Sequence, residues 1–233
     1  HGHVDIALTR DGDKFRTRLK DETAIVDKKT VERPLDDVVL AIHNNALRPR
    51  PEALKGKDFD YLGEDKFFLL PQTQEQSIIW PGYNTQALDY QDYKDGTVTL
   101  NIKPVEMPDG AQVGLFTTEG LGKGFTPLIN SAEGDYSIET TFASHTHTNW
   151  AFTKPGMYKL EVSYSATTTD GKEITSEPQT LTVAAGDAAI KDCVSAKDGN
   201  EGGNKGGNKG EGNDKPGSTK PNDNKSSGEK DMK

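Results

Sequence analysis

Apolar and polar residues alternate in short runs along the first 185 positions of the chain, and turn residues bound each run. The clearest run extends from Met157 to Ala166, where Tyr158, Leu160, Val162 and Tyr164 alternate with polar residues. An alternation of period two is typical of a half-buried antiparallel strand. The runs predict strands near residues 2–9, 37–43, 67–70, 76–80, 97–103, 111–117, 136–143, 145–153, 156–167 and 174–184.

Helical periodicity is scarce. Only the region from Pro51 to Lys57 could form a turn or two, because prolines recur along the rest of the chain. Asp170-Gly171 predicts a hairpin between the last two strands. Regular strands with Gly and Pro turns predict an all-β fold, an antiparallel β-sandwich. Two packed sub-sandwiches divided near residues 104–110 are the alternative.

The composition changes at the end of the last predicted strand. From Ala196 onward the residues are almost all small or polar, and Gly-Gly-Asn-Lys occurs at 202–205 and again at 206–209. Such a segment cannot bury enough surface to offset the entropy of ordering it. We therefore expect a β-sandwich surface domain at residues 1–185 and a flexible, disordered Gly/Asn/Lys-rich linker at 186–233.

The net charge is confined to the predicted domain. Residues 186–233 contain nine Lys and nine Asp or Glu, so the whole formal charge of −9 lies on residues 1–185. A negative domain lacks the positive field that phosphate binding requires. Nucleic acid is therefore excluded as a partner.

The single cysteine and the hydropathy bear on the compartment. Cys193 cannot form an internal disulfide, which fits either a cytosolic protein or an exported one that does not rely on disulfides. No segment approaches the roughly 18 apolar residues of a membrane span, and no signal peptide is visible. Because the sequence starts at His1 and stops at Lys233 without such signals, we expect it to be a mature or trimmed fragment.

Four of the five histidines form two His-x-His pairs, one at each end of the predicted domain. In a strand, residues two apart point to the same face, so each pair would place both rings on one side. Imidazole nitrogens with one carboxylate are a common ligand set for divalent transition metals, Zn foremost and Mn next. The predicted metal ligands are His3, Asp5, His145 and His147, with His1 and Asn149 as further candidates.

The hypothesis requires strands 2–9 and 145–153 to meet. His1, next to a free terminal amine, could instead chelate Cu or Ni by itself, and Asn149 would act behind the ligands. His43 is interpreted as a packed or loop histidine. Trp80 and Tyr83 are interpreted as turn and core aromatics.

Three stretches of the sequence resemble the actinobacterial surface-anchored proteins described as choice-of-anchor M domain proteins. The last stretch is the most specific and resembles the wall-anchored repeat of that family. The stretches are Gly2–Ile6, Phe68–Gln72 with Ile79–Thr85, and Thr146–Tyr158.

The resemblance implies an exported protein on the cell surface or cell wall of a Gram-positive bacterium. It implies that residues 186–233 span the wall and that an anchor, missing from this sequence, attaches the protein to peptidoglycan. It also implies capture or relay of a divalent metal to an ABC importer, with the substrate-binding protein of that transporter or other surface proteins of the same system as partners.

The residues leave other functions open. We expect no enzyme, because no nucleophile elbow or Ser/His/Asp arrangement occurs; only an amino-terminal copper brace at His1 would suggest one. A structural or adhesive β-sandwich is the main alternative to metal capture. A haem-binding surface module, with Tyr or His as the iron ligand, is a further alternative.

Overall fold

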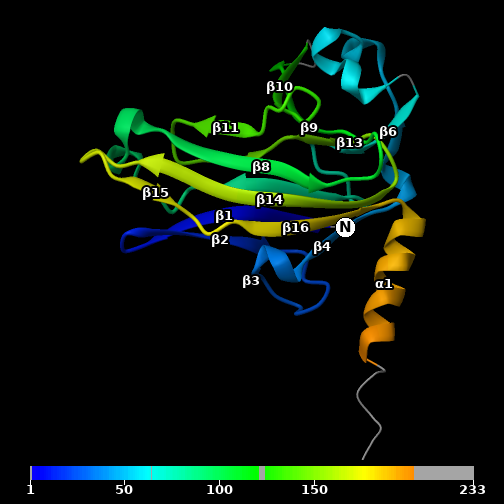
Figure 1. The fold of residues 1–233 in the computed structure, drawn as a ribbon, viewed down its shortest axis with the longest axis horizontal. Coiled ribbons are helices and arrows are strands. Elements are labelled where there is room, and N and C mark those ends of the chain that lie inside the picture. The colour runs from blue at the N-terminus through cyan, green and yellow to red at the C-terminus, as the bar shows by residue number, and fades with distance from the viewer. Residues whose placement is uncertain (1, 64, 121–123, 202–233) are drawn as a thin grey trace, which may run out of the picture.

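A computed structural model describes residues 2–63, 65–120 and 124–201, and its order of elements is mostly β (Figure 1). The predicted all-β, sandwich-like fold is confirmed. The strands form three sheets that pack together, here called sheets A, B and C. Six short 3-10 helices connect them, at Leu35–Asp37, Asn44–Ala46, Glu52–Leu54, Lys57–Leu62, Tyr90–Asp92 and Lys94–Gly96.

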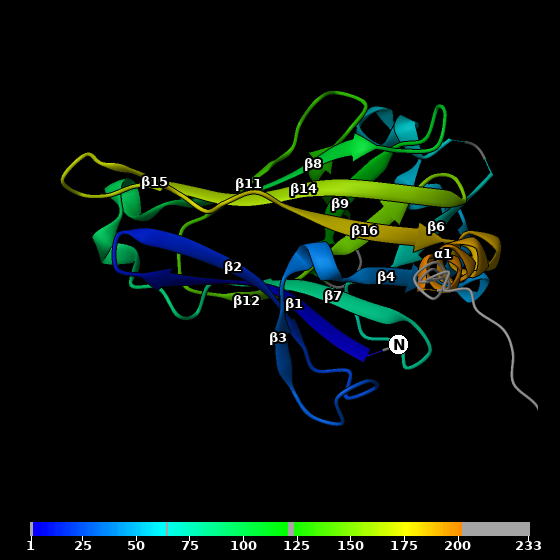
Figure 2. The same cartoon turned by 60° about the horizontal axis from the view of Figure 1, so that its bottom comes forward.

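Sheet A carries His3, His145 and His147. It is mixed, because β1 pairs with β7 in parallel and with β2 in antiparallel orientation. Figure 2 shows its strands at the lower front of the molecule. Its order is β12 (His145–His147), β7 (Ile79–Asn84), β1 (Gly2–Asp11), β2 (Lys14–Asp21) and β3 (Val31–Arg33).

Sheet B packs on the inner face of sheet A. The hairpin predicted at Asp170-Gly171 joins β14 to β15 and then to β16. The one parallel pair of this sheet is β16 with β4. Its order is β11 (Ser137–Thr140), β8 (Val98–Glu106), β14 (Gly156–Thr167), β16 (Gln179–Ala185) and β4 (Val39–Ile42), with β15 (Glu173–Thr175) paired to β14.

Sheet C is antiparallel throughout. Its outer face is covered by Leu54, Phe59 and Leu62 from the two 3-10 helices that follow Pro51, and these side chains pack on Phe67 and Phe116. Its order is β10 (Phe125–Asn130), β9 (Val113–Thr118), β13 (Asn149–Phe152), β6 (Lys66–Leu70) and β5 (Leu47–Pro49).

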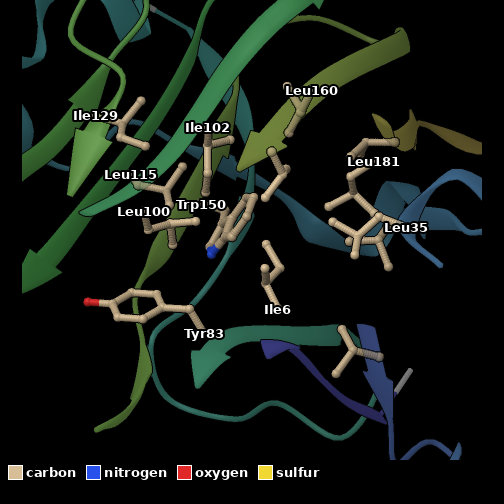
Figure 3. Packing of buried hydrophobic residues seen from close by; sticks show 14 of the residues in the cluster. Ile6, Leu35, Tyr83, Leu100, Ile102, Leu115, Ile129, Trp150, Leu160 and Leu181 are labelled. Carbon is tan, nitrogen blue, oxygen red and sulfur yellow. The ribbon is translucent and has the colours of Figure 1, made fainter. Parts of the chain in front are cut away.

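One hydrophobic core joins the three sheets. Trp150 of sheet C is fully buried, and Figure 3 shows it beside Leu100, Ile102 and Leu115. Residues on both sides of positions 104–110 share this core, and β8 runs into that region without a break. The alternative of two sub-sandwiches divided there is therefore wrong.

Two predictions about strands need correction. The sandwich is not purely antiparallel, because the β1–β7 and β16–β4 pairs are parallel. The segment 145–153 is not one strand: it breaks at Thr148, so β12 belongs to sheet A and β13 to sheet C. The sequence pattern also missed β2, β3, β5 and β10.

The first part of the predicted linker is helical. The helix α1, Asp187–Glu201, follows β16 directly and contacts β4, β14 and β16. Its apolar residues Ile190, Cys193 and Val194 line a cavity of about 160 Å³ together with strand residues. These three positions have the 3.6-residue spacing of a helix, which the prediction of a linker did not take into account. The rest of the predicted linker, 202–233, lies outside the described residues. Within the described residues, no helix is long and apolar enough to cross a membrane.

Candidate metal centre

His3 and the His145–His147 pair lie on one outer face of sheet A, but their strands, β1 and β12, are not neighbours. Strand β7 lies between β1 and β12, and pairs with both. Gly82 of β7 is in register with Asp5 on one side and with His147 on the other. Side chains on the flanking strands can therefore meet only above Gly82.

Gly82 leaves the space in which they meet. A Cβ atom at this position would lie 2.6 Å from Asp5 Oδ1 and 2.7 Å from His147 Cε1. Both distances are far below van der Waals contact, so any side chain here would push the two groups away. The Pro81-Gly82 pair lies inside β7. A glycine inside a strand is a known mark of close approach.

The four predicted ligands converge above this glycine. The Nε2 atoms of His3 and His145 lie 3.1 Å apart, and those of His145 and His147 lie 3.2 Å apart. The Asp5 carboxylate lies 3.1 Å from His3 Nε2 and 3.0 Å from His145 Nε2. One candidate ligand atom from each of the four residues falls within 4.8 Å of the others. The cluster could therefore hold a metal ion.

The spacing fits tetrahedral coordination. Four ligands placed about 2.0–2.1 Å from a zinc ion are separated from one another by about 3.3 Å. The nitrogen–nitrogen separations of 3.1 and 3.2 Å are close to that value. The ligand His147 lies 3.9 Å from Asp5 Oδ1, so this pair would draw slightly closer around an ion.

In two of the rings, a hydrogen bond at the outer nitrogen, Nδ1, directs the lone pair of the inner nitrogen, Nε2, toward the centre of the cluster. His147 Nδ1 donates to the carbonyl oxygen of Pro81 at 3.0 Å, and His3 Nδ1 donates to the Glu22 carboxylate at 2.5 Å. When Nδ1 carries the proton of a neutral imidazole, Nε2 is an acceptor. Hydrogen bonds from ring nitrogens to carboxylates and carbonyls are the usual means of orienting metal-bound histidines.

The centre of the cluster is consequently rich in acceptors. Asp5 is fully buried, and its nearest polar neighbours are imidazole nitrogens, with His145 Nε2 3.0 Å from Oδ2 and His3 Nε2 3.1 Å from Oδ1. A buried carboxylate is costly unless it is paired with positive charge or hydrogen-bond donors. When Nε2 of His3 and His147 also acts as an acceptor, a cation at the point where they meet would satisfy the carboxylate and both ring nitrogens.

The pKa values of Glu22 and His147 are shifted in the directions that favour metal binding. Hydrogen bonding to Lys20, 2.5 Å away, and to His3 lowers the pKa of Glu22 against the opposing effect of burial. Glu22 is thus a carboxylate at neutral pH. Burial lowers the pKa of His147, although its bond to Pro81 and the charge of Asp5 oppose the shift. His147 is therefore neutral at pH 7 and able to bind metal.

Trp80 supports the site in a way that the sequence did not reveal. Its ring stacks on His147 with centroids 3.5 Å apart and planes 8° apart. Its Nε1 donates to the carbonyl of Gln72 at 3.0 Å, which fixes the indole. Trp80 was interpreted as a turn or core aromatic, whereas Tyr83 does lie in the core.

Asn149 does not belong to the cluster. The break at Thr148 carries it into β13, where its side chain accepts from Gln72 N and donates to Phe116 O and Thr118 Oγ1. The expectation that it stands behind the ligands is therefore wrong. Its role is to join strands of sheet C to the loop after β6.

Of the two remaining histidines, only His43 is described, and it is separate from the site. His1 lies outside the described residues. His43 is an exposed residue after β4, as expected of a loop histidine, and its Nδ1 lies 2.8 Å from Asp187 at the start of α1.

Comparisons with known proteins add no relative. A scan of protein-family models gives no match, and searches of curated proteins and of solved structures give none either. The resemblance to surface-anchored proteins thus stays a prediction, and the site has to be interpreted from its geometry.

Proposed function

We propose that this protein binds one divalent transition metal ion, zinc foremost, at His3, Asp5, His145 and His147. The observation that supports the proposal is the convergence of three imidazole rings and a fully buried carboxylate, with the outer nitrogens of two rings held by Glu22 and Pro81. Three nitrogens and one oxygen suit Zn²⁺, whereas Mn²⁺ prefers more oxygen ligands.

The proposal extends to capture and relay rather than catalysis. Four protein ligands fill a tetrahedral zinc ion, while a catalytic zinc keeps a position for water or substrate. We propose that the ion is cargo, held at the cell surface for delivery to an ABC importer. This second step is supported by the family resemblance alone, and it stands or falls separately from metal binding.

Metal analysis tests the binding step. The protein, purified with chelator and then dialysed against equimolar Zn²⁺, Mn²⁺ and Cu²⁺ in turn, should retain about one Zn²⁺ per chain by elemental analysis. His43→Ala, which alters a histidine outside the cluster, should retain the same amount. A parent protein that retains no metal would leave the structural β-sandwich as the better interpretation, and a Soret band after haem addition would favour the haem module.

The pH dependence of zinc affinity is a second test of the binding step. Protonated imidazole cannot bind metal, so protons compete with the ion as the pH falls through the histidine range. We expect zinc affinity to fall between about pH 7.5 and 5, because free imidazole takes up its second ring proton within this interval. Titration calorimetry at several pH values measures it, and an unchanged affinity would contradict histidine ligation.

A further inference from the structure

The four ligand side chains are not equally enclosed. Asp5 is fully buried, and the exposed fraction of the side chain rises to 10% at His147, 17% at His3 and 32% at His145. His145 lies on β12, which is the edge strand of sheet A and contains only three residues. The cluster is therefore most open to solvent at His145.

The ligands also differ in what holds them from outside the cluster. Glu22 fixes the ring of His3, while Pro81 and the Trp80 stack fix the ring of His147. The Nδ1 atom of His145 has no hydrogen-bond partner among the described residues, and its Nε2 contacts only the other ligands. A bound ion would replace those contacts. In the loaded site, the His145 ring would then be oriented by the metal bond alone.

The backbone beneath His145 is nevertheless well fixed. Thr85 N donates to the carbonyl of Ser144 at 2.8 Å, and Ser144 N donates to Thr85 Oγ1 at 3.2 Å. Freedom at this ligand therefore belongs to the imidazole side chain and not to the strand. The ring can rotate away from the cluster while β12 stays paired with β7.

The surface beside His145 is open to a partner. Phe142, three residues earlier, is 68% exposed although it is a large apolar residue. One edge of β12 is unpaired within the described residues. A molecule that approaches this edge would therefore meet His145 first among the four ligands.

We infer that His145 is the exchange ligand of the site, through which the metal ion enters and leaves. This inference rests on the proposed function. A nitrogen or carboxylate donor from an acceptor molecule displaces His145 Nε2 first, while His3, Asp5 and His147 keep the ion. Further displacement then transfers it. One donor replaces another at each step, and neither the charge nor the oxidation state of the metal changes.

The mechanism predicts the order of the reaction. If the acceptor attacks the loaded site before the metal leaves, the transfer rate rises with acceptor concentration; if the metal leaves first, the rate is constant. Stopped-flow mixing of the zinc-loaded protein with a chromogenic chelator, pyridylazoresorcinol, measures this rate. We expect it to rise in proportion to the chelator concentration.

Single-ligand variants identify the residue. His145→Ala should still bind one Zn²⁺, and should lose it to the chelator about tenfold faster, within the range known for weakened zinc sites. His147→Ala should retain no stoichiometric zinc. His43→Ala is the matched control and should behave as the parent does. The unfolding midpoint of each metal-free variant shows that it folds, and His3→Ala serves in place of His147→Ala if that variant does not.

The outcomes separate this inference from the proposed function. A parent protein that takes up no zinc contradicts the function itself. A parent that binds zinc, with His145→Ala losing it as completely as His147→Ala, overturns only the inference. A transfer rate that is independent of chelator concentration, or no faster in His145→Ala, overturns it as well.

Discussion

Two groups of polar side chains flank Thr148, and they differ in whether each donor is paired with an acceptor. On the later side, Asn149 uses its oxygen and its amide protons on Gln72, Phe116 and Thr118. On the earlier side, the Nε2 atom of His145 lies beside the Nε2 atoms of His3 and His147, so ring nitrogens face one another. Buried polar groups in proteins are normally satisfied, so folding alone explains the first group, whereas the second could also hold a metal ion.

The largest expected effect comes from neutralising the buried carboxylate. Asp5→Asn keeps the shape of the side chain but removes the negative charge that faces three imidazoles. Zinc affinity should fall by more than the about 10–100-fold that is typical of losing an outer-shell partner. Titration calorimetry with Zn²⁺ measures the change.

The matched variant lies in the other polar group. Asn149→Ala leaves the partners of its side chain unpaired, so it should lower the free energy of unfolding by about 2 kcal/mol or more. Zinc stoichiometry should stay the same, because Asn149 contacts none of the four ligands. Loss of zinc in a folded Asn149→Ala protein would show that the two groups are not independent.

An intermediate effect is expected from filling the space above β7. Gly82→Ala places a methyl group against Asp5 and His147, which must then separate. Misplaced ligands should reduce zinc affinity by about 10–100-fold, as outer-shell disruptions do. Gly56→Ala is the control, since a Cβ atom there meets no atom within 4 Å and its φ of 173° is ordinary extended backbone. Equal zinc affinity in the two variants would contradict the packing argument.

The smallest effect is expected at Glu22, which holds His3 without joining the ligands. Glu22→Gln keeps a hydrogen-bond acceptor but removes its charge, so zinc affinity should fall by about tenfold. Glu32→Gln alters an exposed carboxylate of β3, 3.9 Å from Arg16, and should leave affinity unchanged. A similar loss in both variants would point to a general effect of surface charge.

The sequence could predict those parts of the site that depend on local alternation. The period of two placed His3 with Asp5, and His145 with His147, on common faces, and the structure brings these four together. It could not predict that β7 lies between the two segments, because strand order depends on packing over long distances along the chain. Gly82, Trp80 and Glu22 were missed for the same reason.

The fold shows the same division between local and long-range information. The alternating segment that became β14 was predicted with its full range, 156–167, because its apolar face is buried throughout. The strand β2 also alternates, with Phe15, Thr17 and Leu19 buried, but charged residues dominate its composition and concealed it. The break at Thr148 separates His147 from Asn149, but no Gly or Pro marks it in the sequence.

The ligands His3 and His145 are separated by 142 positions of the chain. An ion bound between them would connect β1, the first described strand, to β12 and close a very long loop. In the chain-entropy description of cross-links, closing a 100-residue loop restricts the unfolded state by about 4.7 kcal/mol. The protein has a single cysteine, Cys193, and so no internal disulfide. A bound metal ion would then act as a reversible cross-link, and its release would also make the amino-terminal strand less stable.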